Sequence, residues 1–395
     1  SPTLILESDS VIWVSLWKSS EVSSSTSQCL WVEYSPEALS IETDISASSW
    51  KCLRDALAMA VSKAPNIIMM IGDGMGLSQI SSGMYSNNNY TSLERSQHVG
   101  LIKTHSFDNL VSDSAASGTA MSSGVKTYNR VVGMDENFIP VKSILEISRD
   151  KGYMTAIIAT STIVHATLAS YYSKVKSRYD YNEIASQLSK SNINFFVGGG
   201  EKYFNDRRDK RNLMNEMDDY SFANSLENFI EINSNKIGFL TYYDDPIGKH
   251  EGRKPSLEDM VQATIKKLKS FNKPFFLLVE GSQIDWGGHD NDSEHLISEM
   301  LEFDRTVGKV FNFAEKDKNT TVVITADHET GGLSIVDGNL EDSKVINKYV
   351  SEDHTATMVP IFSLGPYSSL FNGIYDNTEI FDKLEAIIIK WKKYF

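Results

Sequence analysis

Cysteine is scarce in this chain of 395 residues, which holds only Cys29 and Cys52. Two thiols cannot supply a structural zinc site built from four cysteines. They could form one disulfide in an oxidising compartment or stay free, and the sequence leaves both alternatives open. No apolar run approaches the roughly 20 residues of a transmembrane helix. The short apolar segment at 11–14 has no basic segment before it, so it is a poor signal peptide.

Basic residues are outnumbered, with 38 Lys and Arg against 52 Asp and Glu, which gives a net charge of −14. This balance argues against general nucleic-acid binding, which depends on neutralising phosphates with Lys and Arg. It does not exclude an anionic substrate, because bound dications invert the local field. The hydrophobic fraction of 41% and the charged fraction of 23% are typical of a soluble globular protein.

The first 62 residues differ from the rest of the chain, because they are rich in serine and show no sustained hydrophobic period. Only residues 50–61 have the spacing of an amphipathic helix. We therefore expect an N-terminal extension of uncertain origin at 1–62 and one catalytic domain at 63–395. Because the chain starts at Ser1 and not at a methionine, a processed form whose export signal lies outside this sequence stays an open alternative.

From Asn66 onward, short apolar runs alternate with amphipathic segments. The runs predict strands at 67–71, 155–159, 195–197, 275–279, 321–325 and 360–364, and the segments predict helices at 143–151, 181–190, 257–270, 294–316 and 378–393. Strands that alternate with helices predict an α/β fold of three layers, α/β/α, with a mostly parallel central sheet. In such sheets the active site lies beyond the carboxyl ends of the strands.

Carboxylate and imidazole side chains lie at the ends of three predicted strands. They are Asp73, Glu280, Asp285, Asp327 and His328. Each has an ordinary alternative, since an aspartate between glycines is often a turn residue and an Asp-His pair can cap a helix. Together at one sheet edge they favour a metal centre. Zinc accepts imidazole nitrogen and carboxylate oxygen, whereas magnesium prefers an all-oxygen shell, which Asp73, Glu280 and a hydroxyl such as Thr167 would suit.

The segment Asp113–Ala120 places a serine after a carboxylate and before small residues compatible with a helix. This pattern predicts Ser114 at a helix N-terminus, where free N–H groups and the helix dipole favour an anion. A serine hydroxyl also needs a base or a metal to become a nucleophile. With metal ligands elsewhere in the chain, the pattern points to phosphoryl transfer, although a lone run of small residues more often packs two helices closely.

From about Pro65 to its C-terminus, the chain resembles the alkaline phosphatase family. The resemblance rests on the segments Ile71–Gly76, Asp113–Ala120, Gly124–Asn129, His165–Thr167, Glu280–Asp285 with His289, Thr325–His328 and Asp353–Thr355, and on Arg178. It implies that Ser114 is the nucleophile and becomes phosphoserine, and that Arg178 binds the phosphate through its planar fork. Asp113 and Trp286 would also line the substrate site.

The resemblance also implies a set of metal ligands. The first zinc ion would take Asp285, His289 and His354, the second Asp73, Asp327 and His328, and a magnesium ion Asp73, Thr167 and Glu280. His165 stands where the best-known bacterial pattern has aspartate, and Trp286 where that pattern has lysine, so the metal preference of the third site is open. We further expect the adjacent glycines 287 and 288 to loosen their loop.

The implied activity is the hydrolysis of phosphate monoesters of broad specificity at alkaline pH, with two zinc ions and one magnesium ion. A homodimer and export to the periplasm or the medium are expected on the same ground. One alternative is a phosphodiesterase or sulfatase of the same superfamily, and another is a metal-dependent phosphate-binding protein without turnover. The sequence does not give the physiological substrate.

Overall fold

The computed structural model describes residues 3–8, 11–15, 29–33 and 64–390. The chain divides into two compact units, Ser1–Val61 and Ser62–Phe395. In the first unit, β1 (Thr3–Ser8), β2 (Val11–Ser15) and β3 (Cys29–Glu33) form an antiparallel sheet, which the sequence did not predict. The helix expected at 50–61 and the thiol of Cys52 lie outside the described residues.

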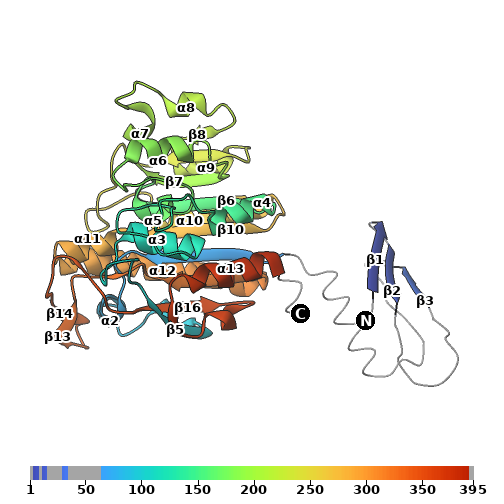
Figure 1. Cartoon of the computed structure of the whole chain (residues 1–395). Helices are drawn as coiled ribbons and strands as arrows, with labels where there is room; N and C mark the ends of the chain where they lie inside the picture. The colour runs from blue at the N-terminus through green and yellow to red at the C-terminus, as the bar shows by residue number, and fades with distance from the viewer. Residues whose placement is uncertain (1–2, 9–10, 16–28, 34–63, 391–395) are drawn as a thin grey trace, which may run out of the picture. The chain divides into compact units, whose positions relative to one another are not determined.

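A ten-stranded sheet forms the centre of the second unit, in the order β17-β5-β16-β11-β4-β10-β6-β7-β9-β8 (Figure 1). β16 runs antiparallel to its neighbours β11 and β5, and the other neighbouring pairs are parallel, as predicted for most of the sheet. The strands are β4 (Asn66–Gly72), β5 (His98–Lys103), β6 (Met154–Thr162), β7 (Phe195–Gly199), β8 (Ser221–Ala223), β9 (Ile237–Leu240), β10 (Phe275–Gly281), β11 (Thr320–Thr325), β16 (Val359–Leu364) and β17 (Gly373–Asp376).

Helices cover both faces of this sheet, which gives the three layers that the sequence predicted (Figure 1). On one face, α3 (Ser114–Ser123) contacts α4 (Ile144–Asp150), α5 (Ala166–Ala169) and α13 (Glu379–Lys390). On the other face, α12 (Ser293–Asp317) contacts α2 (Leu77–Tyr85) and α10 (Leu257–Ser270). Every residue of β4, β6, β10 and β11 is buried, as expected for apolar strands covered on both sides.

Shorter elements complete the unit. They are α6 (Tyr181–Leu188), α7 (Lys202–Asn205), α8 (Leu213–Glu216), α9 (Leu226–Glu231), α11 (Gln283–His289), the 3-10 helices η1 (Ser92–Arg95) and η2 (Ser368–Phe371), the pair β12 (Glu329–Thr330) with β15 (His354–Thr355), and the hairpin of β13 (Ser334–Asn339) and β14 (Lys344–Lys348). None of the helices in residues 64–390 combines the length and the apolar character that a bilayer crossing requires.

Side-chain caps explain where several predicted helices begin. Asp113 accepts a hydrogen bond from the backbone N–H of Ala116 and so starts α3. Ser143 and Glu146 form a reciprocal capping box at α4. Such caps satisfy backbone N–H groups that the first helical turn leaves without a partner.

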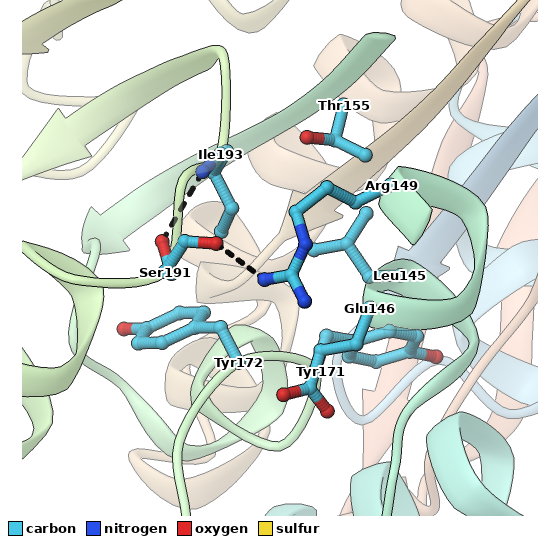
Figure 2. A pocket seen from close by; sticks show the side chains of 8 residues that line it. All are labelled: Leu145, Glu146, Arg149, Thr155, Tyr171, Tyr172, Ser191 and Ile193. Carbon is cyan, nitrogen blue, oxygen red and sulfur yellow. Dashed lines mark hydrogen bonds between the residues drawn. The ribbon is translucent and has the colours of Figure 1, made fainter. Parts of the chain in front are cut away.

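A small pocket lies beside α4, away from the carboxyl ends of the strands (Figure 2). The Arg149 guanidinium crosses it and donates to the carbonyl of Ser191 at 2.6 Å. Glu146, on the same helix, pairs with Lys174 at 3.0 Å. Because its charged groups bond to the protein itself, this pocket connects α4 to the chain before β7 and belongs to the framework of the fold.

Candidate metal centre and active site

The ends of β4, β10 and β11 meet through hydrogen bonds that backbone N–H groups donate. The N–H of Asp73, just after β4, donates to the carbonyl of Gly281 at the end of β10 at 3.1 Å. The N–H of Gly74 donates to the carboxylate of Asp327, just after β11, at 3.2 Å. Gly74 has a φ of 71°, and a Cβ there would lie 2.8 Å from the Cα of Asp285. Glycine is therefore required at position 74, where three strand ends converge.

One group of potential ligands joins Asp73, Asp327 and His328, all of them buried. The Nε2 atom of His328 lies 3.2 Å from Oδ2 of Asp327 and 3.6 Å from Oδ1 of Asp73. Neither of these two carboxylate oxygens has a hydrogen-bond partner. Buried, unpartnered carboxylate oxygens beside an imidazole nitrogen are a donor set that fits a divalent cation.

The pKa shifts in this group also indicate a site for a cation. Burial, followed by the nearby charges of Asp327 and Asp285, raises the pKa of Asp73 well above its ordinary value. Burial and the charge of Asp285 also raise the pKa of Asp327. Burial and the neighbouring imidazole of His354 lower the pKa of His328, which keeps that ring neutral. A cation among these groups would offset the repulsion between the carboxylates and use the neutral imidazole as a ligand.

A second group joins Asp285 and His289 on α11 with His354 on β15. Asp285 lies 3.4 Å from Nε2 of His289 and 3.6 Å from Nε2 of His354, and the two Nε2 atoms are 3.1 Å apart. The Nδ1 atoms of both rings face backbone carbonyls, those of Glu352 and Ser112. Such bonds fix ring orientation and leave the Nε2 atoms directed at one point.

In this second group, Asp285 and His289 shift each other's pKa in opposite directions. The hydrogen bond with Asp285 raises the pKa of His289 to about 9, against the effect of burial. Burial opposes ionisation of Asp285, but the hydrogen bond with His289 and the charges of His328 and His354 hold the pKa of Asp285 below its ordinary value.

Glu280, inside β10, lies next to these groups with both carboxylate oxygens buried and unpartnered. Burial and the charge of Asp327 raise its pKa to about 8. The hydroxyl of Thr167 donates to Oδ2 of Asp73 at 3.3 Å. Asp73 is thus hydrogen-bonded to Thr167, and the charge of Asp327 acts on Glu280. The side-chain oxygens of Asp73, Thr167 and Glu280 could therefore bind a third cation, and an all-oxygen set of ligands suits magnesium.

His165 has a different set of neighbours. Its Nε2 atom lies 3.8 Å from the carboxylate of Asp245, a residue that the sequence did not single out. Its ring stacks on Tyr181, with centroids 5.9 Å apart, and meets Trp286 at 5.8 Å. His165 therefore contacts Trp286, which lies on α11, so the structure brings these two predicted site residues together.

Ser114 is the first residue of α3, as the sequence predicted, and it is buried. Its Oγ atom lies 3.3 Å from Nε2 of His328. One carboxylate oxygen of Asp113 accepts two hydrogen bonds, from Nη1 of Arg178 at 3.1 Å and from the backbone N–H of Arg130 at 3.0 Å. Burial opposes the charge of Arg178, but Asp113 and Asp73 outweigh it and raise its pKa. A permanent cation is thus bound to Asp113, the residue that precedes the serine.

The expectation that glycines 287 and 288 loosen a loop is wrong. Both lie within α11, where a Cβ at Gly287 would come within 2.6 Å of the backbone nitrogen of Leu296 on α12. A Cβ at Gly288 would come within 2.9 Å of Thr330. The two glycines allow α11 to approach its neighbours closely, which fixes Asp285 and His289 firmly.

Sequence reasoning also missed the residues that follow His328. Thr330 donates a hydrogen bond to Asp285, and its hydroxyl lies 3.3 Å from Nδ1 of His328. It therefore contacts both ligand groups. The available signal was the position of Thr330 two residues after a predicted ligand, His328.

Comparisons with known proteins identify the family of this chain. The family model of alkaline phosphatase matches residues 64–348. The chain therefore belongs to the alkaline phosphatase family. Alkaline phosphatase 4 of Bacillus subtilis is 39% identical over 291 residues, which are 68% of this chain and 62% of the relative. The repressible alkaline phosphatase of Saccharomyces cerevisiae is 33% identical over 322 residues, 70% of this chain and 57% of the relative.

The chain thus spans less than two thirds of the length of these curated relatives. Among solved structures, the alkaline phosphatase from the Antarctic bacterium TAB5 is 39% identical, with a TM-score of 0.79 over 83% of this chain and 99% of that chain. A variant of that enzyme, with a histidine replaced by aspartate and Mg bound in the M3 site, has a TM-score of 0.78 and 37% identity over 82% of this chain and 98% of that chain.

Proposed function

We propose that this protein hydrolyses phosphate monoesters of broad specificity at alkaline pH, through a phosphoserine on Ser114. One observation carries the proposal: Ser114 Oγ, at the N-terminus of α3, lies 3.3 Å from Nε2 of His328, which belongs to a buried group with two carboxylates that each have one unpartnered oxygen. The names of the relatives, all alkaline phosphatases, support the same activity.

The donor sets suit three cations. Asp285, His289 and His354 would hold one zinc ion and Asp73, Asp327 and His328 the other, while Asp73, Thr167 and Glu280 would hold magnesium. When bound, these ions supply positive charge that favours an ionised serine and stabilises the leaving oxygen. The Mg-bound variant of the Antarctic relative supports a magnesium ion. His165, paired with Asp245, would influence the metal preference of the third site.

The protein's own groups position the substrate. Arg178, held by Asp113, offers two parallel N–H donors to the phosphate oxygens. The free N–H groups at the start of α3 add positive potential at the same place. Trp286, next to Asp285 on α11, would line the side where the leaving group sits.

The covalent chemistry centres on Ser114. Its oxygen attacks phosphorus, and the bond between phosphorus and the ester oxygen breaks, which releases the alcohol. Water then attacks the same phosphorus, the bond to the serine oxygen breaks, and inorganic phosphate leaves. The transition state is loose, so most of the rate enhancement comes from positioning and positive charge.

The test compares an aryl phosphate monoester, an aryl phosphate diester and an aryl sulfate as substrates for the full chain. We expect fast release of the phenol from the monoester only, loss of that activity on chelation, and recovery with zinc and magnesium. Faster cleavage of the diester or the sulfate would favour another activity of the superfamily. Phosphate binding without turnover would favour a binding protein. Assembly as a homodimer and export stay predictions of the family resemblance.

A further inference from the structure

Glu329 directly follows His328, yet it belongs to neither ligand group. Its side chain is buried, with 5% of the residue exposed. Four donors satisfy its carboxylate: Gln79 Nε2 at 2.6 Å, the N–H of Leu333 at 3.1 Å, the N–H of Gly332 at 3.2 Å and the hydroxyl of Thr355. A buried carboxylate with this many donors is fixed in place, since each bond compensates part of its lost hydration.

These donors come from separate parts of the fold. Gln79 lies on α2, Gly332 and Leu333 lie in the turn after β12, and Thr355 lies on β15. In the register of the β12–β15 pair, Glu329 is opposite Thr355, and Thr330 is opposite His354. The carboxylate thus ties the strand that follows His328 to the strand that begins with His354.

His328 and His354 belong to different ligand groups. Their rings stack with centroids 3.5 Å apart at an interplanar angle of 19°. The pair of short strands that Glu329 joins therefore sets the separation between one ligand of each group. Gln79 strengthens the same connection, because its Nε2 also donates to the carbonyl of Thr330 at 2.7 Å.

The packing around Glu329 leaves its carbon chain little freedom. A Cβ at Gly76 would lie 2.4 Å from Cγ of Glu329. Gly76 ends the glycine-rich segment that also holds Asp73, a member of the buried ligand group. The glycine at position 76 is thereby explained by the close approach of Glu329, and the loop of Asp73 rests against the same side chain.

We propose that Glu329 is a positioning residue that holds the two zinc-ligand groups in register and so sets their zinc affinity. The inference rests on the proposed function for the assignment of zinc to these groups. Glu329 acts through its neighbours: it orients His328 through the peptide bond that joins the two residues, and His354 through Thr355. Residues that hydrogen-bond directly to metal ligands typically change metal affinity by about 10- to 100-fold when replaced, and Glu329 acts one residue further out.

The main variant is Glu329→Gln, which keeps the size of the side chain but replaces one acceptor oxygen with a donor. The full-length protein is equilibrated with buffered zinc, and bound zinc per chain is measured by elemental analysis together with kcat, KM and the melting temperature. We expect zinc affinity to fall by about 10-fold or more at both groups. We also expect kcat to fall more than KM rises, because Arg178 keeps its contacts.

Glu302→Gln is the matched control. Glu302 is equally buried, but it pairs with Arg253 and Lys249 and touches no candidate ligand. We expect this variant to lower the melting temperature and to leave zinc affinity unchanged. Thr355→Val removes one hydrogen-bond donor to Glu329 and keeps the Glu329 carboxylate. It should weaken zinc binding less than Glu329→Gln does, and it provides the measurement if Glu329→Gln does not fold.

Wild-type zinc affinity in folded Glu329→Gln, or in folded Thr355→Val if the first variant does not fold, would overturn the proposal. So would an equal loss of zinc in Glu302→Gln, because the effect would then reflect general destabilisation. The proposed function fails separately: a wild-type protein that binds zinc but does not hydrolyse phosphate monoesters refutes the activity, while the zinc measurements still test the role of Glu329.

Discussion

Ser114 Oγ lies 3.3 Å from Nε2 of His328, although the two residues are 214 positions apart in the sequence. The two atoms are close because α3 begins at Ser114, next to the end of β11, and Asp327 and His328 directly follow β11. A hydroxyl at a helix N-terminus and a buried imidazole thus lie side by side, and we expect the reacting phosphate to bind there.

A substitution in one ligand group should remove zinc from that group and leave zinc bound in the other. We expect His289→Ala to remove zinc from the group of Asp285, and His328→Ala to remove it from the group of Asp73, because each change deletes one of three protein ligands. Zinc per chain after dialysis is the measurement, and His250→Ala, at a histidine outside both groups, is the control. Full zinc occupancy in both ligand variants would place the ligands elsewhere.

Arg178→Lys should weaken phosphate binding more than it slows turnover at saturation. The ammonium keeps the charge but loses the planar two-point grip of the guanidinium, and it cannot reproduce the contact with Asp113 at 3.1 Å in the same geometry. We expect KM and the inhibition constant of inorganic phosphate to rise by about 10-fold. Arg149→Lys, at the pocket beside α4, serves as the control. Unchanged phosphate inhibition in Arg178→Lys would exclude Arg178 from the site.

Chelation should destabilise the protein more at pH 9 than at pH 7. Without a cation, burial and Asp327 raise the pKa of Glu280 to about 8, and the hydrogen bond with Asp285 raises that of His289 to about 9. Both groups then bind more protons in the folded chain than in the unfolded chain, so stability falls as the pH rises through this window. Glu280 alone accounts for about 1 kcal/mol of the loss.

The measurement is the melting temperature of metal-loaded and chelated protein at both pH values. The depressed pKa of His328 adds little here, since its ring is mostly neutral in both states above pH 7. We expect the gap between loaded and chelated protein to widen from pH 7 to pH 9, and Glu280→Gln to reduce that widening. A gap that narrows with rising pH would contradict the raised pKa values.

Deleting residues 1–49 should leave metal content and most of the turnover in place. None of the candidate site residues lies there, and Ser62–Phe395 forms a compact unit of its own. A cut that also removes 50–61 should reduce the oligomeric state, if that segment contributes to a subunit interface. Elemental analysis and light scattering on both truncated chains measure these outcomes. Loss of zinc in the shorter truncation would show that the extension belongs to the catalytic domain.

The sequence predicted the centre of the fold better than its edges. Strands β4, β10 and β11 are continuous apolar runs because both of their faces are buried, and such runs are easily recognised. The outer strand β5 mixes buried and exposed residues, and most of β17 is not buried, so neither has a clear period and neither was predicted. The antiparallel direction of β16 depends on pairing across the sheet, which no local pattern reports.

At the site, the sequence identified the candidate ligands but not what holds them. The predicted ligand residues carry the chemistry of metal binding in their side chains, so their type is informative. Glu329 and Thr330 act through contacts made by the fold, with Gln79 and Thr355 in one case and with Asp285 in the other. Their roles depend on distances between segments, and these distances become known only from the structure.

Trapping the covalent intermediate tests the role of Ser114 as nucleophile. Metal-loaded protein is mixed with a phosphate monoester, quenched in acid and digested, and the peptides are examined by mass spectrometry, with Ser114→Ala as the matched control. We expect phosphate on the peptide that holds Ser114, its absence from the variant, and a loss of nearly all turnover in a variant that stays folded and keeps its zinc. Phosphate on another residue, or wild-type turnover in folded Ser114→Ala, would show that Ser114 is not the nucleophile.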